Sequence, residues 1–120
     1  VEFGLMKRFR SVRNLKLIDP AGYLDFIKLL SESGLVITDS GGIQEEATFL
    51  KIPCLTLRDS FERPETLEIG TNTLCKLNEG LILRKIREIL EGKYKKGRMP
   101  ILMDGKASTR IVNILKSSLK

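Results

Sequence analysis

The residues best suited to chemistry occupy positions 38–47, which read TDSGGIQEEA and follow the short apolar run 35–37. A strand that ends in Ser-Gly-Gly and turns into a helix is typical of a phosphate-binding site. Gly41 and Gly42 have no side chains to keep a phosphate away from the backbone, and the first N–H groups of the helix point at it. The helix dipole adds partial positive charge at the same place. Ser40, Gly41 and Gly42 are therefore candidate phosphate ligands.

Ser40 and the two carboxylates that follow it also have simpler interpretations. Serine is a common helix N-cap, although two successive glycines in the first turn cost stability that a plain cap does not require. Acidic side chains such as Glu45 and Glu46 complement the dipole of a helix N-terminus. Beside a diphosphate, a carboxylate would instead face the ribose, whose vicinal hydroxyl groups donate bidentate hydrogen bonds.

A second polar cluster occupies positions 58–65, which read RDSFERPE and follow the apolar run 53–57. Its candidate functional residues are Arg58, Glu62 and Arg63, which fall in a predicted loop, where functional residues concentrate. The planar guanidinium of Arg63 suits phosphate oxygens, so Arg63 is a candidate clamp on a pyrophosphate. A loop held together by salt bridges is the alternative interpretation.

Apolar patterns along the chain alternate between strands and helices. Such alternation predicts an α/β protein with a Rossmann-like parallel sheet flanked by helices, in one domain over residues 1–120. Asn78 is expected to cap a long helix, and Asp19-Pro20 to begin an earlier one. The expected strands are 14–18, 35–38, 53–57 and a short one near Leu74, and the other expected helices are 21–32, 42–50 and 107–119.

The expected strands also predict where a ligand binds. In such sheets the ligand lies beyond the carboxyl ends of the strands. Asp19, Ser40 and Arg58 each follow an expected strand, which favours one site at one edge of the sheet. The strand 35–38 is mostly apolar, so we expect it to be buried on both faces.

Composition narrows the classes of protein. The chain has 120 residues and is 42% hydrophobic, which argues for an ordered domain, and it has no apolar run of the roughly 18 residues that cross a bilayer. It contains no His and no CxxC, so no metal site is expected, and Cys54 and Cys75 are interpreted as buried thiols of a cytoplasmic protein. The net charge of +6 would suit nucleic acid, but the basic residues spread along helices with few aromatics among them, so no nucleic-acid partner is expected. The start at Val1, without Met, suggests a piece of a longer protein.

The motif DSGGIQEEA at 39–47, together with RDxxERPE at 58–65, resembles the C-terminal half of the non-hydrolysing UDP-N-acetylglucosamine 2-epimerases. The resemblance extends from about Leu15 onward. It implies a two-domain, GT-B-like fold, with the active site in the cleft between this UDP-binding domain and a missing N-terminal domain. Members of the family eliminate UDP to leave a 2-acetamidoglucal and add UDP back after C2 has inverted.

The resemblance also implies roles for individual side chains. Glu46, the last Glu of the SGGxQEE run, would hold the ribose, and Glu45 would contact the ligand or only support the loop. Phe26 closes the PxxYxxF run 20–26 and would stack on the uracil, although an aromatic at helical spacing is more often part of a core. The family pattern is broken at Ser60-Phe61, where two threonines are common. The expected UDP ligands are Ser40, Gly41, Gly42, Glu46, Phe26 and Arg63, with Glu45, Glu62 and Arg58 as secondary candidates.

The family's acid–base carboxylates and its active-site His would lie outside this chain, so no catalytic residue and no cofactor are expected in it. The 120-residue piece alone is expected to be inactive. A full-length homodimer that acts in polysaccharide biosynthesis would use UDP-N-acetylglucosamine and UDP. A GT-B glycosyltransferase, a hydrolysing epimerase and a basic non-enzymatic binding domain stay open as alternatives.

Overall fold

A three-stranded parallel sheet forms the centre of the computed structural model, which describes residues 4–60 and 63–120. The strands are β1 (Val36–Thr38), β2 (Cys54–Thr56) and β3 (Asn72–Leu74), in the order β1-β2-β3. Val36 pairs with Cys54, and Cys54 with Asn72. The sheet confirms the predicted α/β class.

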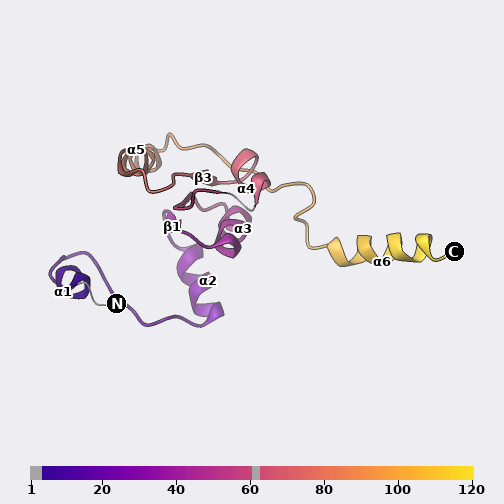
Figure 1. Ribbon diagram of the computed structural model, residues 1–120, viewed down its shortest axis with the longest axis horizontal. Helices are drawn as coiled ribbons and strands as arrows, with labels where there is room; N and C mark the ends of the chain where they lie inside the picture. Colours follow the sequence, from indigo (N-terminus) through magenta and orange to yellow (C-terminus); the bar gives the residue numbers. More distant parts are fainter. Residues whose placement is uncertain (1–3, 61–62) are drawn as a thin grey trace.

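Helices join the strands and extend from the sheet (Figure 1). The helix α3 connects β1 to β2 and contacts all three strands, while α2 packs against α3. The helix α6 projects away from the sheet, so the molecule measures 65 × 32 × 27 Å along its principal axes. In the described part the helices are α1 (Leu5–Arg10), α2 (Tyr23–Ser31), α3 (Gly41–Leu50), α4 (Pro64–Glu68), α5 (Glu79–Leu90) and α6 (Ala107–Ser118).

Local signals explain where several helices begin and end. The side chain of Asn78 accepts a hydrogen bond of 2.9 Å from the N–H of Leu81, which confirms the predicted cap of α5. At the other end of α3, Lys51 takes the left-handed conformation, with φ 59°, and its N–H donates to the carbonyl of Thr48. The helix α4 was not predicted, although Pro64 at its first position is a typical start signal.

The predicted strand 14–18 is wrong, and so is the predicted helix start at Asp19-Pro20. Residues 14–22 form no regular element, and α2 begins after Gly22, whose carbonyl accepts from the N–H of Phe26 at 2.8 Å. A strand needs a partner for its backbone groups, and the described part of the chain offers segment 14–18 none: β1 pairs only with β2.

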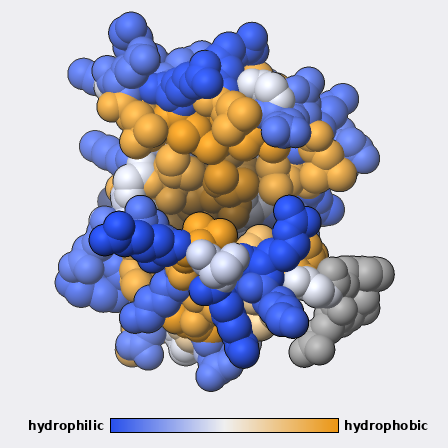
Figure 2. Space-filling model, turned by 90° about the vertical axis from the view of Figure 1, so that its left-hand side faces the viewer, coloured by the Kyte–Doolittle hydropathy of each residue, from blue (hydrophilic) through white to orange (hydrophobic). Residues whose placement is uncertain are grey.

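Burial of β1 on both faces was also wrongly predicted. Ile37 is 42% exposed, because β1 is an edge strand and its outer side has no cover among the described residues. Figure 2 shows a broad apolar patch on the side of the molecule where β1, α1 and α5 lie. No helix in residues 4–60 and 63–120 combines the length and apolar character needed to cross a membrane.

The core is small and unusually polar. Its buried apolar residues are few, and among the described residues the buried amide and hydroxyl side chains outnumber them. The predicted burial of Cys54 and Cys75 is confirmed, and both are free thiols. The buried residues are Leu30, Ala47, Cys54, Leu55 and Cys75, with the polar Gln44, Thr48, Thr56, Thr66, Thr71 and Asn72.

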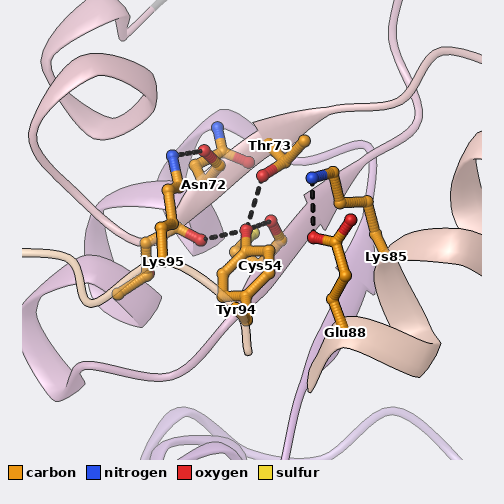
Figure 3. Close-up of polar contacts among 8 residues, drawn as sticks. Cys54, Asn72, Thr73, Lys85, Glu88, Tyr94 and Lys95 are labelled. Atoms are coloured by element: carbon orange, nitrogen blue, oxygen red, sulfur yellow. Dashed lines mark hydrogen bonds and ion pairs between the residues drawn. The ribbon is translucent and has the colours of Figure 1, made fainter. Parts of the chain in front are cut away.

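Hydrogen bonds from Tyr94 and Lys95 attach the segment after α5 to the start of β3 (Figure 3). The Tyr94 hydroxyl donates to the carbonyl of Thr71 at 2.7 Å and lies 2.6 Å from Oγ1 of Thr73. The Lys95 ammonium donates to the backbone carbonyls of Leu67, at 2.7 Å, and of Asn72. These bonds satisfy carbonyl groups at the end of α4 and the start of β3.

Because Cys54 is buried and Tyr94 is half-buried, we expect the free energy of unfolding to fall in alkali. Burial raises the pKa of Cys54 from 9.0 to about 11 and that of Tyr94 from 10.0 to about 12. Above pH 9 the unfolded chain therefore loses protons that the folded chain keeps, and the free energy of unfolding falls by up to about 1.4 kcal/mol per pH unit and group. Denaturant titrations from pH 8 to 11 measure this fall. In the Cys54→Ser variant the free energy of unfolding should fall less steeply between pH 9 and 10 than in the wild type. Equal slopes in the two proteins would show that Cys54 does not contribute.

Candidate functional site

The carboxyl edge of the sheet brings together two of the predicted site segments. Ser40 follows β1 by two residues, and Arg58 follows β2 by two residues. The N–H of Leu57 donates to the carbonyl of Thr38 at 2.9 Å, so the chain leaves β1 and β2 side by side. Asp19, the third predicted member of this edge, does not follow a strand and lines a different cavity, with Met6 and Arg10 of α1.

The N-terminus of α3 is open to a ligand. Ser40 takes an extended conformation at the N-cap position, but its side chain makes no capping hydrogen bond, so it does not satisfy the first-turn N–H groups. The loop is shaped by Thr38, whose Oγ1 accepts from the N–H of Ser40 at 3.1 Å. A Cβ added to Gly42 would come no closer than 4.0 Å to any neighbour, the nearest being Oγ of Ser40. Packing within the described chain therefore does not require glycine there.

An ion pair links the second polar cluster to α3. Nε of Arg63 lies 2.7 Å from Oε1 of Glu45, and both side chains are nearly half exposed. Such exposed pairs contribute little to stability, but this one holds Arg63, the N-cap residue of α4, beside α3. The pair lines a cavity of about 520 Å³, together with Pro64, Glu65, Thr66, Ile69 and residues 100–103.

Glu46 lines a neighbouring cavity of about 300 Å³. Tyr23 and Ile27 of α2 contribute to its wall, so α2 and α3 face each other there. Phe26 is half-buried on α2 and is not among the described side chains that line this cavity. The other lining residues are Glu45, Phe49, Leu50 and Met103.

Two predicted site residues, Arg58 and Glu62, are not among the described side chains that line either cavity, and one residue that lines both cavities was not predicted. Glu62 lies outside the described residues, and Arg58 is half-buried after β2. No sequence motif pointed to Met103, which lines both cavities. Within residues 4–60 and 63–120 no cluster of three or more His, Cys, Asp and Glu side chains could hold a metal ion.

Comparison with known proteins gives a consistent result. Residues 3–116 match the family model described as UDP-N-acetylglucosamine 2-epimerase. The chain is 45% identical over 114 residues to the UDP-N-acetylglucosamine 2-epimerase of Methanocaldococcus jannaschii, covering 95% of this chain and 31% of that protein. It is 39% identical over 111 residues to the Escherichia coli K12 enzyme of that name, covering 89% of this chain and 30% of the relative.

Solved structures agree. The M. jannaschii UDP-GlcNAc 2-epimerase in complex with UDP-GlcNAc and UDP superposes with a TM-score of 0.76 at 42% identity, covering 97% of this chain and 32% of that one. The Staphylococcus aureus MnaA–UDP co-structure gives a TM-score of 0.78 at 36% identity, covering 95% of this chain and 32% of that one.

The fold is thus the Rossmann-like, parallel-sheet type found in GT-B-like proteins. The chain belongs to the UDP-N-acetylglucosamine 2-epimerase family. It spans about a third of the length of the relatives that it matches.

Gly42→Ala separates ligand binding from folding. The space around Gly42 accepts a methyl group, and Ala favours a helix over Gly by up to about 1 kcal/mol, so stability should hold or rise. If a phosphate approaches the backbone here, the same methyl group should lower UDP affinity about tenfold or more. Calorimetric titration and thermal unfolding of the full-length protein measure the two effects.

The matched control is Gly80→Ala, because Gly80 is also the second residue of a helix, α5, and has room for a Cβ at 3.6 Å from Asn78. It should leave UDP affinity unchanged. Normal UDP binding by Gly42→Ala would remove Gly42 from the phosphate site.

Proposed function

We propose that this chain is the UDP-binding C-terminal domain of a longer, non-hydrolysing UDP-N-acetylglucosamine 2-epimerase. One observation carries the proposal: the open N-terminus of α3, with Gly42 unobstructed, lies at the carboxyl edge of a parallel sheet in a chain of this family. Relatives solved with UDP or UDP-GlcNAc bound support the choice of nucleotide.

We assign different residues of this chain to the phosphates, the ribose and the uracil of UDP. The α3 N-terminus, through Ser40, Gly41 and Gly42, would bind the phosphates with backbone N–H groups and the helix dipole. Glu46 would accept hydrogen bonds from the ribose hydroxyls. Phe26 would stack on the uracil, which requires its half-buried ring to become accessible to the ligand.

Arg63 would act as a cationic clamp on the diphosphate. In the described chain its guanidinium is paired with the carboxylate of Glu45 across an exposed contact. Because such a pair is weak, a diphosphate with several charged oxygens can compete for the same guanidinium. Glu45 would then hold Arg63 ready in the absence of ligand, with Arg58 and Glu62 as further candidates.

The exposed apolar surface supports a missing N-terminal domain. Large apolar side chains are exposed on α1, at Leu5, Met6 and Phe9, and along α6, at Ile111, Ile114 and Leu115. An exposed apolar face on this scale marks an interaction surface. The chain covers about a third of its relatives, and the remaining length is enough for another domain.

In the proposed reaction this domain stabilises departing UDP and keeps it for re-addition. Removal of the C2 proton requires a base. The resemblance assigns the family's acid–base carboxylates to the missing domain and its active-site His to a part of the protein outside this chain. The chain contains no His, so the isolated piece should not turn over substrate. The buried thiols support a reducing, cytoplasmic location, and a homodimer is proposed for the full-length protein.

The alternatives differ in their products. A glycosyltransferase would pass the sugar to an acceptor, and a hydrolysing epimerase would release UDP and free N-acetylmannosamine. A non-hydrolysing epimerase instead equilibrates UDP-GlcNAc with UDP-ManNAc. Proton NMR of a reaction with the full-length protein and UDP-GlcNAc alone distinguishes the three.

Nucleotide selectivity and Glu46 provide the binding test. The full-length protein should bind UDP more tightly than ADP or GDP, because the proposed site reads the uracil. Glu46→Gln keeps the side-chain size but loses the charged acceptor, so UDP affinity should fall by about 1–3 kcal/mol. Calorimetry measures both. Equal affinity for the three nucleotides would refute the uridine assignment, and normal UDP binding by Glu46→Gln would leave the helix dipole as the reason for that carboxylate.

Arg63→Ala tests whether this side chain retains UDP. Without the clamp, UDP and the unsaturated sugar should leave before re-addition, so 2-acetamidoglucal should accumulate in the NMR assay while UDP affinity drops about tenfold or more. Lys28→Ala is the control, since Lys28 pairs with Glu32 on the exposed face of α2. A slow Arg63→Ala variant with no free glucal and unchanged UDP affinity would leave Arg63 as a structural partner of Glu45.

A further inference from the structure

Gln44 lies within the SGGIQEE segment, yet its side chain is buried and does not reach the surface. Its side chain is 0% exposed, while its neighbours Gly42, Glu45 and Glu46 reach the surface or line the cavities. The Gln44 side chain points instead into a set of buried polar groups. We call Gln44, Thr56, Thr66 and Asn72 the buried amide network.

Asn72, at the start of β3, is the centre of this network. Its Nδ2 donates to Oε1 of Gln44 at 3.1 Å and to Oγ1 of Thr66 at 3.2 Å, and its Oδ1 accepts from Oγ1 of Thr56 at 2.5 Å. Both N–H groups and the oxygen of this amide are therefore used. Asn72 is fully buried, and reversing its amide alone would place its oxygen against Oε1 of Gln44.

The network ends at the backbone of Arg63. Oγ1 of Thr66 donates to the carbonyl of Arg63 at 2.7 Å, and this leaves an oxygen lone pair of Thr66 to accept from Asn72. Arg63 is the N-cap residue of α4, so the bond holds the carbonyl group of Arg63 at the start of that helix. An unbroken series of hydrogen bonds thus joins Gln44 in α3 to the main chain of Arg63.

We propose that the buried amide network is a positioning device for the UDP site: through Asn72 it sets Arg63, at the start of α4, in register with the α3 N-terminus and Glu46. The inference rests on the proposed function, because it assigns a purpose to residues that act through the proposed UDP ligands. Gln44, Asn72 and Thr66 are positioning residues, since their side chains are buried and are proposed to act through Arg63. They share the rigid, buried character that holds a binding group in one geometry.

The choice of side chain at position 44 supports this role. Nε2 of Gln44 has no hydrogen-bond partner among the described residues, and burying such a donor costs free energy. An apolar side chain of similar volume would fill the space without that cost. The bond that Oε1 accepts from Asn72 is what an apolar residue could not provide.

The test is a double-mutant cycle in the full-length protein, with UDP as the titrant. Thr66→Val removes the hydroxyl with little change of shape, and Thr66→Ser keeps it. Thr66→Val should lower UDP affinity roughly tenfold in the wild-type background and hardly at all beside Arg63→Ala, because it acts through Arg63. Thr66→Ser should bind UDP almost as the wild type does.

The matched control is Thr73→Val. Thr73 follows Asn72 in β3 and points to the opposite face of the strand. Its hydroxyl lies 2.6 Å from that of Tyr94 (Figure 3). The Thr73→Val variant should lose stability without losing UDP affinity. If Thr66→Val fails to fold, Gln44→Met enters the same cycle, since it removes only the amide.

The outcomes separate the two proposals. A wild-type protein that binds no UDP refutes the proposed function before any variant is compared. If UDP binds, the positioning role is overturned by any of three results: unchanged affinity in Thr66→Val, the same loss with and without Arg63, or an equal loss in Thr73→Val. A loss that depends on Arg63 and is rescued by Thr66→Ser supports it.

Discussion

The structure depends on the buried amide of Asn72, which holds three elements in one arrangement. It joins α3 through Gln44, β2 through Thr56 and α4 through Thr66. Burying an amide is costly unless each of its polar atoms has a partner. Because this amide has partners for all of them, the elements cannot shift against one another without breaking bonds. In a core with so few apolar side chains, that constraint does much to specify the packing.

The candidate site follows from the same arrangement. Parallel strands end at one edge, and α3 begins there with two glycines and with no capping bond from Ser40. The Glu45–Arg63 pair crosses from α3 to α4 on the surface, above the buried amide network that joins the same two helices inside. The exposed ion pair is weak, so an anion can displace Glu45 from Arg63, whereas the hydrogen bonds of the buried amide network stay formed. A binding site gains from both: a fixed frame and a displaceable side chain.

The outer parts of the chain contrast with this frame. Segment 14–18 and helices α1 and α6 expose apolar side chains, and β1 is left as an edge strand. The chain is about a third of its relatives' length, and these surfaces are where we propose that the rest of the protein packs. Near the sheet, local hydrogen bonds stabilise the chain instead, such as the one that the Tyr94 hydroxyl donates to the carbonyl of Thr71. Gly97 approaches Gly70 so closely there that a Cβ would meet backbone at 2.5 Å.

The sequence by itself determined the parallel α/β sheet, the start of α3 at Ser-Gly-Gly and the Asn78 cap, because these depend on local periodicity and on capping chemistry. It also indicated the family, since two spaced motifs are more specific than one. It did not determine that segment 14–18 lacks strand structure, because a strand depends on a neighbour that sequence pattern cannot supply. The roles of Gln44, Thr66 and Asn72 were likewise decided only by tertiary structure. They lie 6 to 28 residues apart in the chain, and nothing in a polar side chain shows that it will be buried against another until the fold brings the two together.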